Sequence, residues 1–549
     1  MAFIRSSKFR HVFGTASRKD ACYENFRVTN CAFEGTFIAA NKKFIAFCVE
    51  VGGGGAFCVV NTDKTGRQDV NLPKVSAHKE YILDLQWNPF NDNMIATCSE
   101  DGSIKIWEIP DIGVLLNMDD SKALLSLDYH ERRCIQIEWH PIASNVLLSV
   151  SQEPKVCVWN LDEGVAEVEI ECHPDIIWNA AWSGKGDKIV TSCKDKKLRI
   201  FDARSGDLLV EGPGHEGSKA QRVLFTFDDK FLFTTGFSRM SERQYACWDA
   251  SDLKQKMLEE LDTANGCLIP YYDPDIQIMY IAAKGDSVIR YYELVDTEPY
   301  CHYINTYQSS APQRGLARIP KRSVNVNACE VAKFYKLYGT KTGYIEPVSF
   351  AVPRKSELYQ DDIYPDCVSI ESAIEASEWF EGKNVEPNRI DMRTLFVGKT
   401  KAKASGGGLK KGGLKGLKAK KEAKETAKST ASSAPKPKEE KKEEPKKETK
   451  EPSPTPQRTS APPQKVTAPT AAAPGVDPTV VKELQSEIKS LKDNEKKMKA
   501  DLKALSDKVK DYDKLAGDIK LLCDAVKKND ERIAALENLV QEESEEEGE

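Results

Sequence analysis

The sequence predicts an all-β, seven-bladed WD-repeat β-propeller, followed by a disordered linker and a C-terminal α-helical coiled coil. Three observations predict this order. Segments of similar pattern recur at intervals of roughly 42 to 52 residues in the first part of the chain. Bulky apolar residues become rare after residue 397, and a heptad pattern begins at Thr479. The three parts of the chain therefore differ in physical character.

The repeats share one pattern. A His begins each clear copy, an apolar strand leads to an aromatic residue, and a turn precedes two further strands. Such repeats are typical of propeller blades, each a four-stranded sheet. Five copies are recognisable, and they end at Trp107, Trp159, Phe201, Trp248 and Tyr292.

Two further segments, 33–61 and 321–337, have strand–turn–strand character without the His and Trp marks. They bring the expected number of blades to seven, and we place the propeller at residues 1–337. A closed ring has to remove the open edges of its sheets. We therefore expect the N-terminal segment to pair with the last blade.

The polar residues of the repeats have a structural interpretation, because buried polar groups need hydrogen-bond partners. In the best-defined copy we expect one hydrogen-bonded chain of His78, Ser99, Asp101 and Trp107. The corresponding residues of the other copies are His130, Trp159, His173, Asp195, His215 and Trp248. Glu153 replaces the Asp in the second copy, so a looser network is expected there.

Several long motifs are not explained by the repeats. They read SSKFRHVFG (6–14), GGGGAFCVV, FTTGFSRMSERQ (233–244), YYDPDIQIMYIAAKGDSVIRYYEL and VPRKSELYQDDIYPD (352–366). Together they resemble the coronin family of actin-binding propeller proteins, continuously over about 390 residues. The linker and terminal coiled coil are also similar to those of short, single-propeller coronins.

The resemblance implies an extension after the last blade, here residues 338–397, packed back along one face. It implies binding to filamentous actin, and a link to the branch-nucleating actin-related-protein complex, mainly through the coiled coil. An arginine after the first Cys-Tyr is tied to filament binding in this family, and CYENFR (22–27) places it at Arg27. The chain lacks the serine that often follows the first Met, which puts regulation by phosphate there in doubt.

Other basic residues are candidates for the same contact. Lys8, Arg10 and Lys19 lie in one N-terminal stretch with Arg27, and a basic patch would steer association with an acidic filament. Arg239 and Arg243 are further candidates, for filament contact or for a conformational role in their loop. Read without the family, each is also compatible with a solvated surface charge.

Residues 398–478 form the predicted disordered linker, because their Lys, Glu, Pro, Ala, Ser and Thr cannot bury enough apolar surface to offset chain entropy. Eleven lysines lie between Lys399 and Lys428. They are compatible with a plain spacer, with contact to an acidic polymer such as actin or a microtubule, or with anionic lipid. No aromatics are interleaved, which argues against a nucleic-acid partner.

Apolar residues at alternating spacings of three and four predict a coiled coil over 479–541, before a solvated acidic tail at 542–549. Near its end Arg532 falls at a g position, Ile533 at a, Leu536 at d and Glu537 at e. This resembles a trimer signature in which Arg reaches Glu on the next helix. β-Branched residues at a with Leu at d favour a dimer instead, and we favour a parallel homotrimer.

Enzyme, cofactor and metal sites are not predicted. The stretch VGKT (397–400) has Arg393 where a phosphate-binding loop needs its first glycine. The 15 cysteines are mostly scattered singly, without a C-x-x-C pair, as expected of reduced cysteines in the cytoplasm. Neither a signal peptide nor a membrane span is apparent. We expect the protein in the cytoplasm, at the actin-rich cortex.

Overall fold

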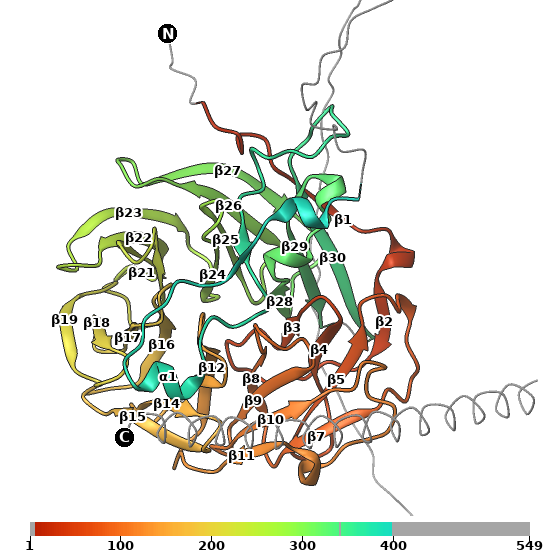
Figure 1. The fold of residues 1–549 in the computed structure, drawn as a ribbon, viewed down its shortest axis with the longest axis horizontal. Helices are drawn as coiled ribbons and strands as arrows, with labels where there is room; N and C mark the ends of the chain where they lie inside the picture. The colour runs from red at the N-terminus through yellow and green to blue at the C-terminus, as the bar shows by residue number, and fades with distance from the viewer. Residues whose placement is uncertain (1–5, 340–341, 398–549) are drawn as a thin grey trace, which may run out of the picture. The chain divides into compact units, whose positions relative to one another are not determined.

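The computed structural model describes residues 6–339 and 342–397 and confirms the seven-bladed propeller. Seven sheets surround a central channel, with the first strand of each blade nearest the channel (Figure 1). The predicted linker, coiled coil and acidic tail lie outside the described residues. No helix within the described part of the chain has the length and apolar character needed to cross a membrane.

The first six blades are four-stranded antiparallel sheets. Blade 1 consists of β3 (Ile38–Ala40), β4 (Phe44–Val49), β5 (Gly55–Asn61) and β7 (Lys74–His78). Blade 2 consists of β8 (Ile82–Trp87), β9 (Met94–Ser99), β10 (Ile104–Glu108) and β11 (Leu125–Leu127). Blade 3 consists of β12 (Cys134–Trp139), β13 (Val146–Ser151), β14 (Val156–Asn160) and β15 (Val165–Ile170).

The repeat pattern continues in the next three blades. Blade 4 consists of β16 (Ile177–Trp182), β17 (Lys188–Cys193), β18 (Lys197–Asp202) and β19 (Leu208–Pro213). Blade 5 consists of β20 (Arg222–Thr226), β21 (Phe231–Phe237), β22 (Arg243–Asp249) and β23 (Gln255–Asp262). Blade 6 consists of β24 (Leu268–Asp273), β25 (Ile278–Ala283), β26 (Val288–Leu294) and β27 (Cys301–Gln308).

Blade 7 combines the two ends of the propeller, as expected for ring closure. Its strands are β28 (Gly315–Arg318), β29 (Glu330–Tyr338), β30 (Gly343–Ala351), β1 (Phe13–Ala16) and β2 (Tyr23–Phe26), with β6 (Gly66–Arg67) beside β2. Both N-terminal strands pair antiparallel with β30. The boundary at residue 337 is therefore corrected: β30 still belongs to the sheet, and the chain leaves the propeller after Ala351.

Tryptophans at the end of the innermost strands join neighbouring blades. The indole of Trp139 donates to the Gln86 carbonyl at 3.1 Å, and that of Trp182 to the Glu138 carbonyl at 3.2 Å. In the other direction, the Asn179 side chain accepts from the Val223 amide at 2.8 Å. Hydrogen bonds between inner strands thus join each of blades 2 to 5 to its neighbour in that series.

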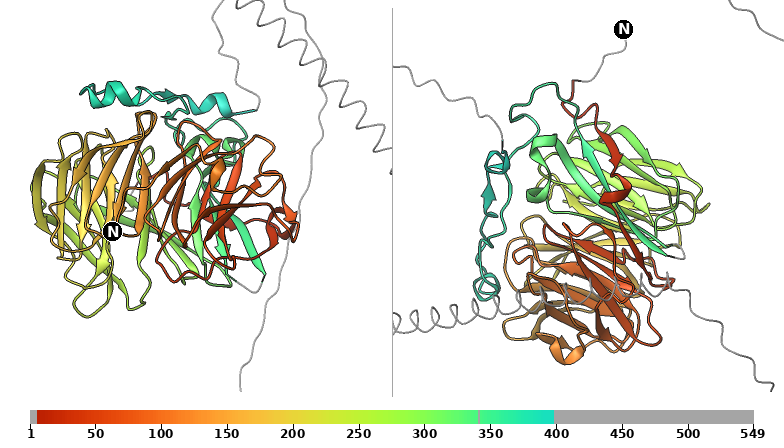
Figure 2. Two further views of the ribbon diagram at one scale, coloured as in Figure 1. Left: turned by 90° about the horizontal axis from the view of Figure 1, so that it is seen from below. Right: turned by 90° about the vertical axis from the view of Figure 1, so that its right-hand side faces the viewer.

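The extension after blade 7 lies along one face of the propeller, here named the extension face (Figure 2). It contains β31 (Cys367–Val368), α1 (Ala376–Phe380), β32 (Arg389–Ile390) and the 3-10 turn η5 (Met392–Leu395). Trp379 of α1 is buried against His140, with ring centroids 4.8 Å apart, and the Arg204 guanidinium lies 4.6 Å from its ring. Cation–π and ring contacts therefore anchor the extension to blades 3 and 4.

Four short 3-10 turns complete the described elements: η1 (Lys19–Ala21), η2 (Asp120–Lys122), η3 (Lys321–Ser323) and η4 (Val326–Ala328). The η2 turn belongs to a long excursion, residues 109–124, between the last two strands of blade 2. Met118 in this excursion donates to the Lys74 carbonyl at 2.9 Å. The excursion therefore covers the outer edge of β7 in blade 1.

Candidate functional site

The N-terminal basic residues are all exposed, but they do not form one compact patch. Phe13 pairs with Ala351 at one end of β30, and Phe26 pairs with Gly343 at the other. The intervening eight residue steps of β30 span about 27 Å. Lys8 and Arg10 precede the first of these ends and Arg27 follows the second. The expected single basic patch is therefore corrected to two separate groups of charges.

Arg27 lies beside a pocket, at the end of β30 away from the extension. A bulge between Glu24 and Phe26 turns the chain at the end of β2, where Asn25 has a φ of 81° and donates to the Gln68 carbonyl at 2.8 Å. The pocket has a volume of about 430 Å³ and is lined by Asn25, Phe26, Arg27, Val49, Glu50, Cys58, Val70, Asn71, Leu72, Lys74 and Thr342. Arg27 thus sits at the rim of a partly apolar hollow.

The exposed Arg27 guanidinium has no hydrogen bond or ion pair with any described residue. Lys19 lies in η1, on the path from β1 to β2. Its side chain is exposed as well. Free cations of this kind are available to an acidic partner.

The two arginines that precede Trp248 have different roles, Arg239 in a loop and Arg243 at the start of β22. Arg243 is buried and forms ion pairs with Asp262 at 2.6 Å and Asp286 at 2.8 Å, which tie blade 5 to blade 6. Arg239 is exposed and pairs with Glu216 at 2.6 Å. Arg243 therefore acts structurally, and of the two only Arg239 is accessible to a partner.

The repeat residues form the hydrogen-bonded chain with one difference from the expected set. His78 Nε2 and the Trp107 indole both meet Thr97 Oγ1, at 2.8 and 3.1 Å. His78 Nδ1 contacts Ser103 Oγ at 2.8 Å, and this hydroxyl donates to Asp101 Oδ1 at 2.6 Å. Ser99 instead accepts from the Asp101 amide at 3.2 Å. Ser99 was expected to link His78 to Trp107, and this is corrected: the linking hydroxyl is that of Thr97.

The other copies vary at the acidic position. In blade 3, Glu153 reaches His130 Nδ1 directly at 2.8 Å, so the looser network expected there is corrected. In blade 4, Asp195 pairs with Arg199 and leaves His173 Nδ1 without a partner among the described residues. Burial lowers the pKa of His173 and of His215 to about 4.

The shared hub of the four networks is a Ser or Thr hydroxyl. The Ser149 hydroxyl accepts a hydrogen bond from the Trp159 indole at 2.8 Å, and the Thr234 hydroxyl accepts one from the Trp248 indole at 2.8 Å. His173 Nε2 meets Thr191 at 2.8 Å. Burial lowers the pKa of every one of the four histidines. They are therefore neutral, buried members of a structural network.

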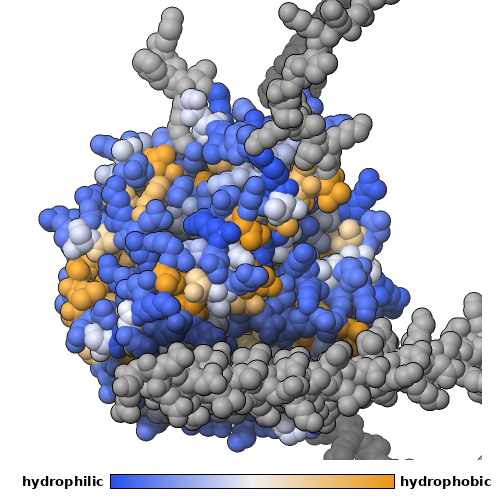
Figure 3. All heavy atoms as spheres, viewed as in Figure 1, coloured by the Kyte–Doolittle hydropathy of each residue, from blue (hydrophilic) through white to orange (hydrophobic). Residues whose placement is uncertain are grey.

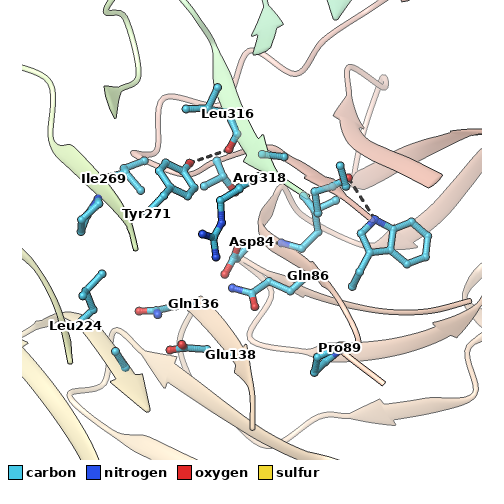
Figure 4. A pocket seen from close by; sticks show the side chains of 18 of the residues that line it. Asp84, Gln86, Pro89, Gln136, Glu138, Leu224, Ile269, Tyr271, Leu316 and Arg318 are labelled. Atoms are coloured by element: carbon cyan, nitrogen blue, oxygen red, sulfur yellow. Dashed lines mark hydrogen bonds between the residues drawn. The ribbon is translucent and has the colours of Figure 1, made fainter. Parts of the chain in front are cut away.

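The central channel is the second concave feature, a cavity of about 530 Å³ (Figure 4). Its lining includes Val368 of the extension. Asp84, Glu138 and Arg318 point into it from different blades. Burial raises the pKa of Asp84 to about 7. Burial and the nearby Asp84 charge raise the pKa of Glu138 to about 8. The described residues that line the channel include no serine, cysteine or histidine to act as a nucleophile beside these acids.

Part of the segment 31–36 lines the channel and is held by side chains from blades 5 and 6. Lys284 donates to the Ala32 carbonyl at 2.8 Å, and Arg222 donates to the Glu34 carbonyl at 2.8 Å. Phe33 lines both the channel and a smaller pocket of about 270 Å³ beyond it. The described residues contain no group of three or more His, Cys, Asp or Glu that could hold a metal ion.

The extension face carries no broad apolar surface in the part that Figure 3 leaves visible. Hydrophobic residues appear there in small groups, separated by hydrophilic ones (Figure 3). Small apolar groups of this kind are normal on a protein surface. The described concave features on this side are the channel mouth and a pocket of about 850 Å³ beside the start of the extension, lined in part by Cys329, Arg354 and Phe396.

The oligomerisation residues predicted from the sequence, Arg532, Ile533, Leu536 and Glu537, lie outside the described residues. Sequence reasoning missed the pocket beside Arg27 and the exposed excursion 109–124. The signal in the sequence was a pair of neighbouring leucines, Leu115 and Leu116, in the segment that follows Trp107. That signal does not reveal which blade the loop joins.

Comparisons with known proteins place the chain among propeller sequences. Residues 2–67 match a family model described as a domain of unknown function, DUF1899. Residues 70–108 and 165–202 match the WD domain, G-beta repeat. Residues 345–387 match a type of WD40 repeat.

Two curated relatives and one solved structure are similar over about 70% of the chain. Coronin-2A of Bos taurus is 43% identical over 395 residues, which is 71% of this chain and 74% of the relative. Coronin-2A of Homo sapiens is 42% identical over the same shares. The crystal structure of the WD40 domain from Toxoplasma gondii coronin has a TM-score of 0.65 at 29% identity, covering 70% of this chain and 97% of that domain.

Proposed function

This chain belongs to the coronin family, and on that premise we propose that it binds actin filaments and organises the actin cytoskeleton. One observation carries the proposal: the 43% identity extends over 395 residues, enough for the whole propeller with its extension. The arginine that the family ties to filament binding is here Arg27, exposed and without an ion pair among the described residues. The protein acts as a binding module and not as an enzyme.

The chemistry of the contact is electrostatic at its start. An acidic filament attracts an unpaired guanidinium, which speeds encounter and favours one orientation of the propeller. Arginine also presents several N–H donors in a fixed plane, which suits paired contacts with carboxylates. Because Lys8 and Arg10 lie at the other end of β30, they serve as long-range charges and not as contacts beside Arg27.

Co-sedimentation of the full-length protein with filamentous actin tests this function. We expect Arg27→Glu to weaken binding at least 10-fold. The matched control is Arg132→Glu, also an exposed arginine on a propeller loop, which should stay within twofold of wild type. A wild-type protein that fails to pellet with filaments would contradict the proposal.

The oligomer gives the weak single contact its strength. The chain forms a parallel homotrimer, in preference to a dimer, through the heptads of residues 479–541. Several heads on one filament convert later contacts into intramolecular ones and raise avidity by roughly 10² to 10⁴. Such an assembly also cross-links filaments.

The outer surface of the coiled coil docks the branch-nucleating actin-related-protein complex, and a pull-down of that complex with residues 479–549 tests this step.

A second contact is favoured by the composition of the linker. Eleven lysines against two glutamates lie between Lys399 and Lys428, and such a run is attracted by the acidic surface of a microtubule or by anionic lipid. Pelleting with microtubules, beside vesicles with and without anionic lipid, separates these partners. The protein then works in the cytoplasm at the actin-rich cortex.

A further inference from the structure

The outer edge of blade 1 exposes more large apolar side chains than a solvated surface needs. Val70 is 74% exposed, Leu115 is 63% exposed and Leu116 is 81% exposed. Isolated apolar residues on a surface are common, but neighbouring ones of this size indicate a docking site. No described residue of this chain covers them.

Leu115 and Leu116 lie at the edge of blade 1 because the excursion pairs with β7, and Val70 lies in the segment that leads into this strand. Lys74 donates its amide to the Asn117 side chain at 2.9 Å, and Met118 donates to the Lys74 carbonyl at 2.9 Å. Val75 and Met118 form a parallel bridge. Leu115 and Leu116 shortly precede this bridge, so they lie near the start of β7.

The same surface reaches Arg27. Val70, Leu72 and Lys74 line the 430 Å³ pocket whose rim carries Arg27. Figure 1 shows β2 and β7 at the outer margin of the ring, in neighbouring blades. We name the set Arg27, Val70, Lys74, Leu115 and Leu116 the blade-1 rim.

The charges of the blade-1 rim indicate its partner. The side chains of Arg27 and Lys74 make no hydrogen bond or ion pair with the described residues. The one acid among the residues that line the pocket, Glu50, already accepts the Asn30 amide at 2.8 Å. Two free cations beside an apolar ridge complement a protein surface with carboxylates around an apolar hollow.

We propose that the blade-1 rim is the docking surface for the actin filament, with Val70, Leu115 and Leu116 supplying the apolar part of the contact. This inference rests on the proposed function and extends it from one arginine to a surface. Arg27 and Lys74 set the orientation, and the apolar side chains hold the complex once water has left.

Charge introduction on the ridge tests the proposal in the full-length protein. Val70→Asp and Leu116→Asp should each weaken co-sedimentation with filamentous actin at least fivefold at fixed ionic strength. The matched control is Leu209→Asp on β19 of blade 4, where the leucine is 49% exposed. It should bind as wild type does. All three positions are exposed, so folding is preserved, and circular dichroism verifies this.

The outcomes separate this inference from the proposed function. If wild type pellets and both rim variants pellet equally well, the docking surface is wrong and actin binding stands. If wild type does not pellet, both proposals fail. The mass of each variant in solution is measured by light scattering. A lower mass for Leu116→Asp would make the rim an interface between copies of this chain and overturn the proposal.

Discussion

At the scale of single residues, the hub of each repeat network is a hydroxyl that serves two partners at once. Thr97 is fully buried and joins His78 Nε2 to the Trp107 indole. Loss of the hydroxyl leaves two buried polar groups without partners, and each such group costs about 1 to 3 kcal/mol. We expect Thr97→Val, which preserves the shape, to lower the free energy of unfolding by about 2 to 4 kcal/mol.

Ser99→Ala is the matched comparison, because it removes a hydroxyl from the same strand. Ser99 accepts from the Asp101 amide and donates to the Glu80 carbonyl at the edge of the sheet. Its loss should cost about 1 kcal/mol. Chemical denaturation of both variants measures the difference. If Ser99→Ala lowers the free energy of unfolding as much as Thr97→Val or more, Thr97 is not the central hydroxyl of the network.

Thr97 and Ser99 show where sequence reasoning stops at this scale. They are two residues apart on β9, so both side chains point to the same face of the sheet. The repeat pattern identifies the His, the acid and the Trp of each network, because these residues recur at similar positions in the repeats. Which of the two hydroxyls lies between His78 and Trp107 depends on how the strands are staggered against each other, and local patterns do not report that stagger.

The channel carboxyls predict a dependence of stability on pH. The pKa of Glu138 is raised from 4.5 to about 8 in the folded protein by burial and by Asp84. The folded state therefore binds more protons than the unfolded state between these values. The contribution of protonated Glu138 to the free energy of unfolding is complete below pH 4.5. It is lost as the pH rises through 8.

We expect the free energy of unfolding to fall by about 1 to 2 kcal/mol between about pH 5.5 and about pH 8.5 on account of Glu138, since the side chain is only partly shielded from solvent. Glu138→Gln should remove that part of the slope. Chemical denaturation of both proteins across this range measures it. Parallel curves for the two proteins would show that Glu138 titrates normally.

At the scale of elements, the hold of the extension on blades 3 and 4 depends on one tryptophan. Trp379 is 2% exposed and packs on His140 and Trp182, at centroid distances of 4.8 and 5.9 Å. Replacing such a residue by alanine costs about 3 to 5 kcal/mol. The start of the extension is held separately, because the Tyr364 hydroxyl donates to the Glu330 carbonyl of blade 7 at 2.8 Å. We therefore expect Trp379→Ala to release the segment around α1 while the seven sheets remain folded.

Limited proteolysis with trypsin measures the release. In Trp379→Ala, cleavage after Lys383 should become at least 10-fold faster, and a stable fragment containing the propeller should accumulate. Glu381→Ala, an exposed change just after α1, should be cut at the wild-type rate. Loss of the whole propeller in Trp379→Ala would instead make the extension part of the core.

The elements differ in how far the sequence predicts them. The strands of blades 2 to 5 follow from a repeat that ends in Trp107, Trp159, Phe201 and Trp248. Ring closure follows from the need to remove open edges. The end of blade 7 was placed too early, because Gly343–Ala351 lacks the repeat marks. The pairing of residue 118 with β7 joins two blades, and local patterns do not report contacts between repeats.

At the scale of the whole molecule, the proposed trimer predicts that the affinity for a filament depends on how many heads each assembly carries. If one propeller makes a weak contact, joining several heads multiplies its effect. The linker of about 80 residues has an end-to-end distance of roughly 50 Å if flexible. Heads on such tethers can reach more than one site on a repeating filament.

Assembly and filament binding are linked through Arg532 in the proposed trimer. If Arg532 at a g position pairs with Glu537 of the next helix, Arg532→Ala removes an ion pair that selects the trimer. We expect full-length Arg532→Ala to have a lower mass by analytical ultracentrifugation, and its affinity for filamentous actin should fall 10-fold or more. Lys503→Ala, which removes a cation one residue after the apolar Leu502 and outside the signature, is the control and should keep both. An unchanged mass for Arg532→Ala would contradict the salt-bridge argument. A lower mass with unchanged affinity would place the binding energy in the single propeller, because avidity requires joined heads.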